Sequence, residues 1–206
     1  MTAARRERAA LVQTMRATGP DAPTLCEGWT TRDLAAHLVV RERRPDAAPG
    51  IMIPQLAGYT DRVQRAAAES TEWDVLLDQI AAGPPVWSPF RLVDPIANMD
   101  EMFIHHEDVR RAQSGWQPRE LDKQTQDGLR RALSLMARLT LGKAPARIRL
   151  VTPDGTEVAA FGKGPELVVT GDVGELTMFV AGREQARLTF SDRQVLEAVR
   201  AARRGL

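Results

Sequence analysis

The chain has 206 residues, of which 43% are hydrophobic, enough to build the core of one large domain or two small ones. Its 28 basic side chains nearly balance its 27 acidic ones, so no basic surplus for nucleic acid and no acidic solvating tail are indicated. One cysteine excludes an intramolecular disulfide framework, and no stretch approaches the roughly 18 apolar residues of a membrane span. The first residues are too charged for a signal peptide. We expect a cytoplasmic globular protein with no nucleic-acid or membrane partner.

The first 142 residues carry the hydrophobic periodicity of helices. Thr30 and Asp33 form a candidate capping box for the second helix, and Pro45 is expected to end that helix. The simplest arrangement for residues 1–142 is a four-helix bundle, in which metal sites are commonly built from side chains that face one another across the core. The predicted helices are 3–17, 31–44, 55–69, 73–82, 95–113 and 121–141.

Beyond Lys143 the pattern changes to the alternation of strands. RIRLVTPDGTEVAAF predicts a hairpin, ELVVTG and ARLTF predict two further strands, and DVGELTMFVAG predicts a helix. Ser191 is expected to cap a last helix that runs to about Arg203. Residues 144–206 therefore form a small α+β domain, and the predicted fold class is α+β, mainly α, with a helical bundle first.

Two of the three histidines lie in the segment NMDEMFIHHEDVRRA, residues 98–112. At the 100° per residue of a helix, Glu101, His105 and Asp108 fall within about 60° of one another. Apolar residues share this side, so we expect the stripe to point inward. The rest of the helix surface is expected to carry Asp100, His106, Glu107, Arg110 and Arg111.

A buried carboxylate and imidazole cost several kcal/mol unless they are paired or bind a metal. The spacing from Glu101 to His105 places an oxygen and a nitrogen ligand one helical turn apart, which suits a shared divalent ion. By itself this spacing favours an ordinary buried hydrogen-bonded pair. In the helix of residues 31–44, apolar neighbours turn His37 inward, where a histidine is more often a satisfied core residue than a ligand.

The sequence also predicts the positions or roles of four further residues near these histidines. Arg41 lies one turn after His37, and it is a candidate anion contact or the partner of a nearby acid. Asp33 lies one turn before His37 and is a candidate to orient its ring. Cys26 is expected to be structural, because no partner that would stabilise a thiolate is evident. Glu42 is expected to face outward.

The segments LCEGWTTRDLAAHL and EMFIHHEDVRRA together resemble the paired signature of the DinB/YfiT-like metalloproteins, in the branch of the mycothiol-dependent maleylpyruvate isomerases. The first contains the pattern GWT-x-x-DL-x-x-HL, which ends on His37 and Leu38. The second matches the metal helix of the family with Glu101, His105 and Asp108. Members of this branch are similar to a helical bundle followed by a small α+β domain, so the resemblance is plausible over the whole chain.

The resemblance implies a divalent metal, most often zinc, on His37, Glu101 and His105. A site with two histidines and one glutamate leaves coordination positions open, as in catalytic zinc sites. Asp108 is expected to accept the other N–H of a ligand histidine, and Asp108 and Arg41 are the candidate catalytic residues. The resemblance also implies a small thiol cofactor, mycothiol in this branch, and suggests a homodimer.

These expectations lead to a metal-dependent thiol transferase or isomerase that acts on a small electrophile. Nothing in the residues selects transfer over isomerisation. Two alternatives stay open, a metal-dependent hydrolase and a non-catalytic protein of this fold that binds a metal or small ligand.

Overall fold

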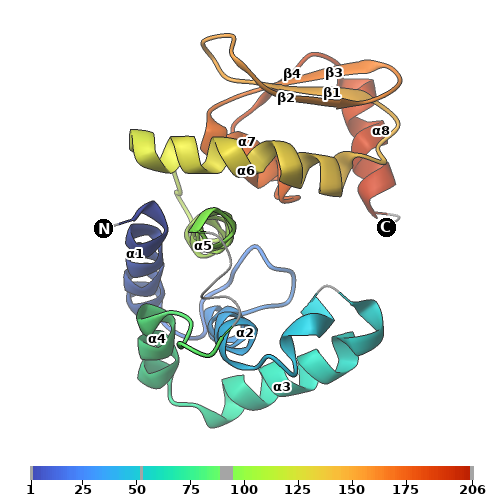
Figure 1. The fold of residues 1–206 in the computed structure, drawn as a ribbon. Coiled ribbons are helices and arrows are strands. Elements are labelled where there is room, and N and C mark those ends of the chain that lie inside the picture. The colour runs from blue at the N-terminus through green and yellow to red at the C-terminus, as the bar shows by residue number, and fades with distance from the viewer. Residues whose placement is uncertain (1, 52, 89–94, 205–206) are drawn as a thin grey trace. The chain divides into compact units, whose positions relative to one another are not determined.

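The structure is a computed structural model that describes residues 2–51, 53–88 and 95–204 (Figure 1). The chain divides into two compact units, Met1–Trp116 and Gln117–Leu206. No helix among the described residues is long and apolar enough to cross a membrane. The architecture of helices with one four-stranded sheet confirms the predicted α+β, mainly α class.

The first unit is helical. Its residues form α1 (Ala3–Thr18), α2 (Thr31–Arg43), α3 (Ala57–Ser70), α4 (Trp73–Ala82) and α5 (Pro95–Arg111), with two short 3-10 helices at Ala48–Ile51 and Pro54–Leu56. The core draws on α1, α2, α4 and α5, and includes Leu11, Met15, Leu34, Leu38, Leu76, Leu77, Ile80, Met102 and Val109.

The start of α2 is fixed by the predicted capping box. The Thr30 hydroxyl accepts the Asp33 backbone N–H, and the Asp33 carboxylate accepts the Thr30 backbone N–H in return. Every residue from Leu34 to Glu42 is buried, so α2 is covered on all sides. His37 of α2 is therefore buried within the first unit.

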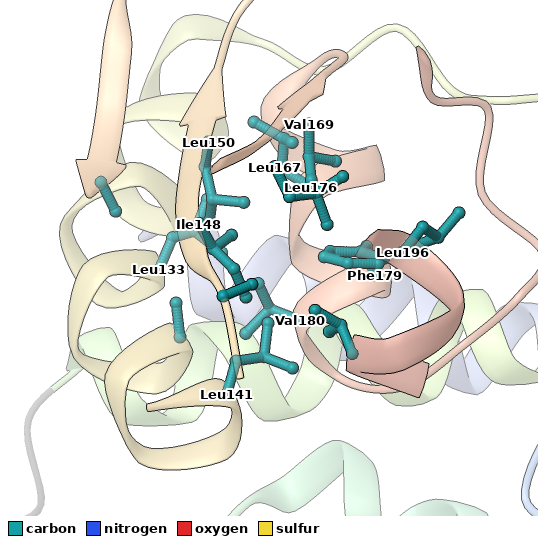
Figure 2. Packing of buried hydrophobic residues seen from close by; sticks show 14 residues of the cluster. Leu133, Leu141, Ile148, Leu150, Leu167, Val169, Leu176, Phe179, Val180 and Leu196 are labelled. Atoms are coloured by element: carbon teal, nitrogen blue, oxygen red, sulfur yellow. The ribbon is translucent and has the colours of Figure 1, made fainter. Parts of the chain in front are cut away.

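The second unit is a sheet with helices. It contains α6 (Lys123–Leu141), β1 (Arg147–Val151), β2 (Glu157–Gly162), β3 (Glu166–Thr170), α7 (Val173–Val180), β4 (Thr189–Phe190) and α8 (Arg193–Arg204). The strand order is β2-β1-β3-β4, in which β1 and β3 are parallel and the other two pairs antiparallel. Leu133 and Leu141 of α6 pack with Ile148, Leu167 and Val180 from the sheet and α7 (Figure 2).

Two expectations are corrected in this unit. The predicted bundle of residues 1–142 included α6, but the buried leucines of α6 belong to the core that also contains β1 and β3, and the division of the chain falls after Trp116. The predicted helix 121–141 corresponds to α6, but hydrophobic periodicity does not say which partner covers the apolar face of a helix. The cap of α8 is Asp192, which accepts the Val195 N–H, because the Ser191 hydroxyl is used to accept the Val168 N–H of β3.

Leu133→Ala is expected to destabilise the second unit by about 2–5 kcal/mol, because the leucine is fully buried and truncation leaves a cavity in the core. Leu139→Ala is the matched control. Its side chain is 78% exposed on the same helix, so the change should stay within about 0.5 kcal/mol. Denaturant unfolding measures both variants, and equal losses would contradict this placement of α6.

Candidate metal centre

Three potential ligands from α2 and α5 converge in the first unit. The carboxylate Oε1 of Glu101 lies 3.3 Å from Nε2 of His105 and 3.8 Å from Nε2 of His37. One ligand atom from each side chain lies within 4.8 Å of those of the other two. Both histidines are largely buried, with side-chain exposures of 9% for His37 and 12% for His105. The residues singled out in two distant segments thus meet at one point.

In each histidine ring, Nδ1 forms a hydrogen bond with a side-chain oxygen. Nδ1–H of His37 donates to the side-chain oxygen of Gln64 at 3.0 Å, and Nδ1–H of His105 donates to Oδ2 of Asp108 at 3.0 Å. An oxygen that accepts from Nδ1–H leaves Nε2 as the ring nitrogen available to a metal. Both Nε2 atoms are the ones that approach Glu101, so they are the atoms through which the two rings would bind a metal.

The charge of Glu101 is balanced by its neighbours. Nε of Arg41, a residue that is only 9% exposed, lies 3.2 Å from Oε1 of Glu101. Burial alone would raise the pKa of Glu101, but hydrogen bonds from His105 and His37, with the charges of His105 and Arg41, hold that pKa well below its usual range. Glu101 is therefore an anion at neutral pH. Of the two expectations for Arg41, the ion pair with a nearby acid is the one observed.

Asp108 lies behind His105 and is fully buried. Its Oδ2 accepts both the His105 Nδ1–H and, at 3.3 Å, the Cys26 thiol. Burial lowers the pKa of His105, but the hydrogen bonds with Asp108, Cys26 and Glu101 outweigh it and raise the pKa well above its ordinary value. The loop that carries Cys26 is tied to α5, because the Leu25 N–H donates to the Asp108 carbonyl at 3.0 Å.

The other face of α5 differs from the prediction. His106, Glu107 and Arg111 were expected on the surface, yet each is at most 3% exposed. For His106 the reason is that α1 packs against α5: the ring bonds to Glu7 at 2.7 Å and to Thr14 at 2.8 Å. Glu107 and Arg111 form an ion pair with each other. Asp100 is half buried, and desolvation followed by the charge of Glu101 raises its pKa to about 7.

Two other expectations for α2 also change. Glu42 was expected to face outward, but it is 2% exposed and forms an ion pair with Arg8 of α1. Asp33 does not reach His37, because its carboxylate is committed to the cap of α2. Gln64 of α3 takes that place, and no sequence signal pointed to it.

The donor set fits a divalent transition metal such as zinc. Two ligands at about 2.0–2.1 Å in tetrahedral geometry are separated by roughly 3.3 Å, close to the observed 3.3 and 3.8 Å between the glutamate oxygen and the two imidazole nitrogens. Imidazole nitrogen and carboxylate oxygen suit zinc, and a three-ligand set leaves a position for a substrate.

Comparison with known proteins finds similar solved structures but no similar sequence family or curated protein. No protein-family model and no curated protein matches the sequence. Among solved structures, the mycothiol-dependent maleylpyruvate isomerase is similar with a TM-score of 0.56 and 16% identity, over 92% of this chain and 90% of that chain. A histidine-to-alanine mutant of that isomerase gives the same TM-score and coverage at 15% identity. The resemblance predicted from the two motifs is thus confirmed in three dimensions: this chain has the fold of the mycothiol-dependent maleylpyruvate isomerase.

Proposed function

We propose that this protein is a metal-dependent enzyme that transfers a small thiol of the mycothiol type to a small electrophile, or uses that thiol to isomerise the electrophile. The single observation that carries the proposal is the convergence of His37, Glu101 and His105, with both Nε2 atoms directed at one carboxylate. The fold shared with a mycothiol-dependent isomerase supports the thiol as cofactor.

The three converging side chains would hold the metal, for which zinc is the expected ion. A zinc ion bound there supplies Lewis acidity, which lowers the pKa of a coordinated thiol from about 8.5 and so increases the thiolate fraction at neutral pH. The proposed role of Asp108 is to keep His105 in the tautomer that offers Nε2, and Gln64 does the same for His37.

Arg41 would act through its charge. Its guanidinium holds Glu101 at 3.2 Å, and as a buried cation it favours the anionic form of a group that binds beside it. In transfer, the thiol would give its proton to solvent, its sulfur would bond to an electrophilic carbon of the substrate, and that carbon would release its leaving group with the bonding electron pair. In isomerisation, the sulfur would add to an activated carbon–carbon double bond, whose π electrons move into the activating group. Rotation about the resulting single bond and expulsion of the thiolate, which regains a proton from solvent, would then re-form the double bond, and neither route needs an oxidant.

Conjugation of mycothiol to a bimane or dinitrophenyl electrophile tests the proposal. Zinc-loaded protein is expected to turn over well above the uncatalysed rate, and removal of the metal by a chelator should abolish the excess, with recovery when zinc is restored. Ester hydrolysis is measured with the same samples, and zinc-dependent ester hydrolysis without thiol conjugation would favour the hydrolase alternative. Normal zinc loading without turnover across a panel of small thiols would reject the transferase and favour a binding protein.

A further inference from the structure

Three potential metal ligands also meet at the other ring nitrogen of His105. Oδ2 of Asp108 lies 3.0 Å from Nδ1 of His105 and 3.3 Å from Sγ of Cys26. One ligand atom from each of these three side chains lies within 4.8 Å of those of the other two. This second cluster, Cys26, His105 and Asp108, shares only His105 with the first cluster, whose Glu101 approaches that ring at Nε2.

The atoms of the second cluster are spaced as zinc or a similar ion would need. Thiolate, imidazole and carboxylate are the ligand types of protein zinc sites, with bonds of about 2.3, 2.0–2.1 and 2.0–2.2 Å. In a tetrahedral site such bonds separate sulfur from oxygen by roughly 3.5 Å and nitrogen from oxygen by roughly 3.3 Å. The observed separations are 3.3 and 3.0 Å, so these atoms would have to move apart by only a few tenths of an ångström.

Backbone hydrogen bonds hold the thiol beside α5. The Leu25 N–H donates to the Asp108 carbonyl at 3.0 Å, and the Cys26 N–H donates to the Thr24 hydroxyl at 3.2 Å. The loop that supplies the sulfur is therefore tied to the same residue that supplies the oxygen. A metal site whose ligands are held in place by such bonds is preorganised.

The charges of the second cluster favour a dication. Binding would release the thiol proton of Cys26 and the Nδ1 proton of His105 to solvent, as coordination by these groups requires. The thiolate and the Asp108 carboxylate would then supply two negative charges to one ion. Asp108 is fully buried, so this attraction would be screened little by water.

We propose that Cys26, Asp108 and Nδ1 of His105 form a second site for a divalent, thiophilic ion such as zinc or cadmium. When both clusters are filled, the His105 ring bridges the two ions as an imidazolate. The two dications repel each other, so the second ion should bind more weakly than the first and fill its site only when metal is in excess. This second site goes beyond the proposed function, which needs only the first cluster.

Cobalt(II) titration of the metal-free full-length protein, without added thiol, tests the second site. The wild type is expected to bind about two ions per chain, and the second should produce the near-ultraviolet charge-transfer absorption of a thiolate ligand. The chain has one cysteine, so thiolate absorption would report on Cys26 alone. Cys26→Ser should bind about one ion without this absorption, because its hydroxyl can still donate to Asp108 but is not a zinc-type ligand.

Two further variants separate the clusters. His37→Ala should lose the first ion and keep one that shows the thiolate absorption, whereas His106→Gln should bind both, because its position belongs to neither cluster. Alkylation of Cys26 in the wild type is an independent measurement. The second equivalent of cobalt should slow alkylation at least about tenfold, since a coordinated thiolate is not free to attack.

The outcomes distinguish the second site from the proposed function. Wild-type binding that stops at one ion without thiolate absorption, or absorption that persists in Cys26→Ser, would overturn the second site and leave the proposed function standing. One ion per chain with thiolate absorption, unchanged in His37→Ala, would support the second site and overturn the first cluster, and with it the proposed function.

Discussion

His37→Ala is expected to lose stoichiometric zinc and, with it, thiol turnover. Replacement of groups that merely support a ligand typically costs about 10- to 100-fold in metal affinity, so loss of a ligand itself should cost more than about 100-fold. His37 is the only member of the cluster that α2 supplies; Glu101 and His105 both come from α5. Elemental analysis of protein purified without chelator measures the loss directly.

His106→Gln is the matched control for that experiment. His106 is the third histidine of the chain and the immediate neighbour of His105, yet its ring bonds to Glu7 and Thr14 on α1. Glutamine keeps a polar side chain in the buried position, so the variant should retain about one zinc per chain. Equal loss of zinc from both variants would contradict the assignment of the ligands.

Much of the geometry of the candidate metal centre was predictable because its residues obey local rules. The capping box of Thr30 and Asp33 fixes where α2 begins, and the apolar residues around His37 indicate that this histidine is buried. The spacing of Glu101, His105 and Asp108 fixes their common face on α5 in the same way. The structure brings these groups together, and the contact of Asp108 with His105 agrees with the expected geometry.

The features that the sequence did not predict depend on packing between distant segments. Gln64 reaches His37 only because α3 packs on α2, and a glutamine in an amphipathic helix has no distinguishing pattern. His106 was predicted on the surface because a helical wheel assumes that one face of the helix is exposed to solvent. In the structure, α1 packs against α5 and His106 is buried. The same assumption misplaced Glu42, since α2 is buried all round.

Glu42→Ala is expected to destabilise the first unit by about 3–5 kcal/mol, the usual cost of leaving one partner of a buried ion pair alone. The partner is Arg8, which is 8% exposed and also donates to the Ile80 carbonyl at 2.9 Å. One hydrogen bond to a carbonyl does not compensate a buried guanidinium charge, so the folded state is penalised directly. Denaturant unfolding with several probes measures the difference.

The exposed pair of Asp78 and Arg16 provides the control, because its atoms lie 3.6 Å apart with the two side chains 78% and 54% exposed. Asp78→Ala should cost no more than about 1 kcal/mol. A double variant, Arg8→Met with Glu42→Leu, removes both charges and should recover most of the loss, since apolar replacements of buried ion pairs are often neutral or stabilising. If Glu42→Ala cost no more than Asp78→Ala, water would have to reach Arg8, and the buried ion pair between α1 and α2 would be wrong.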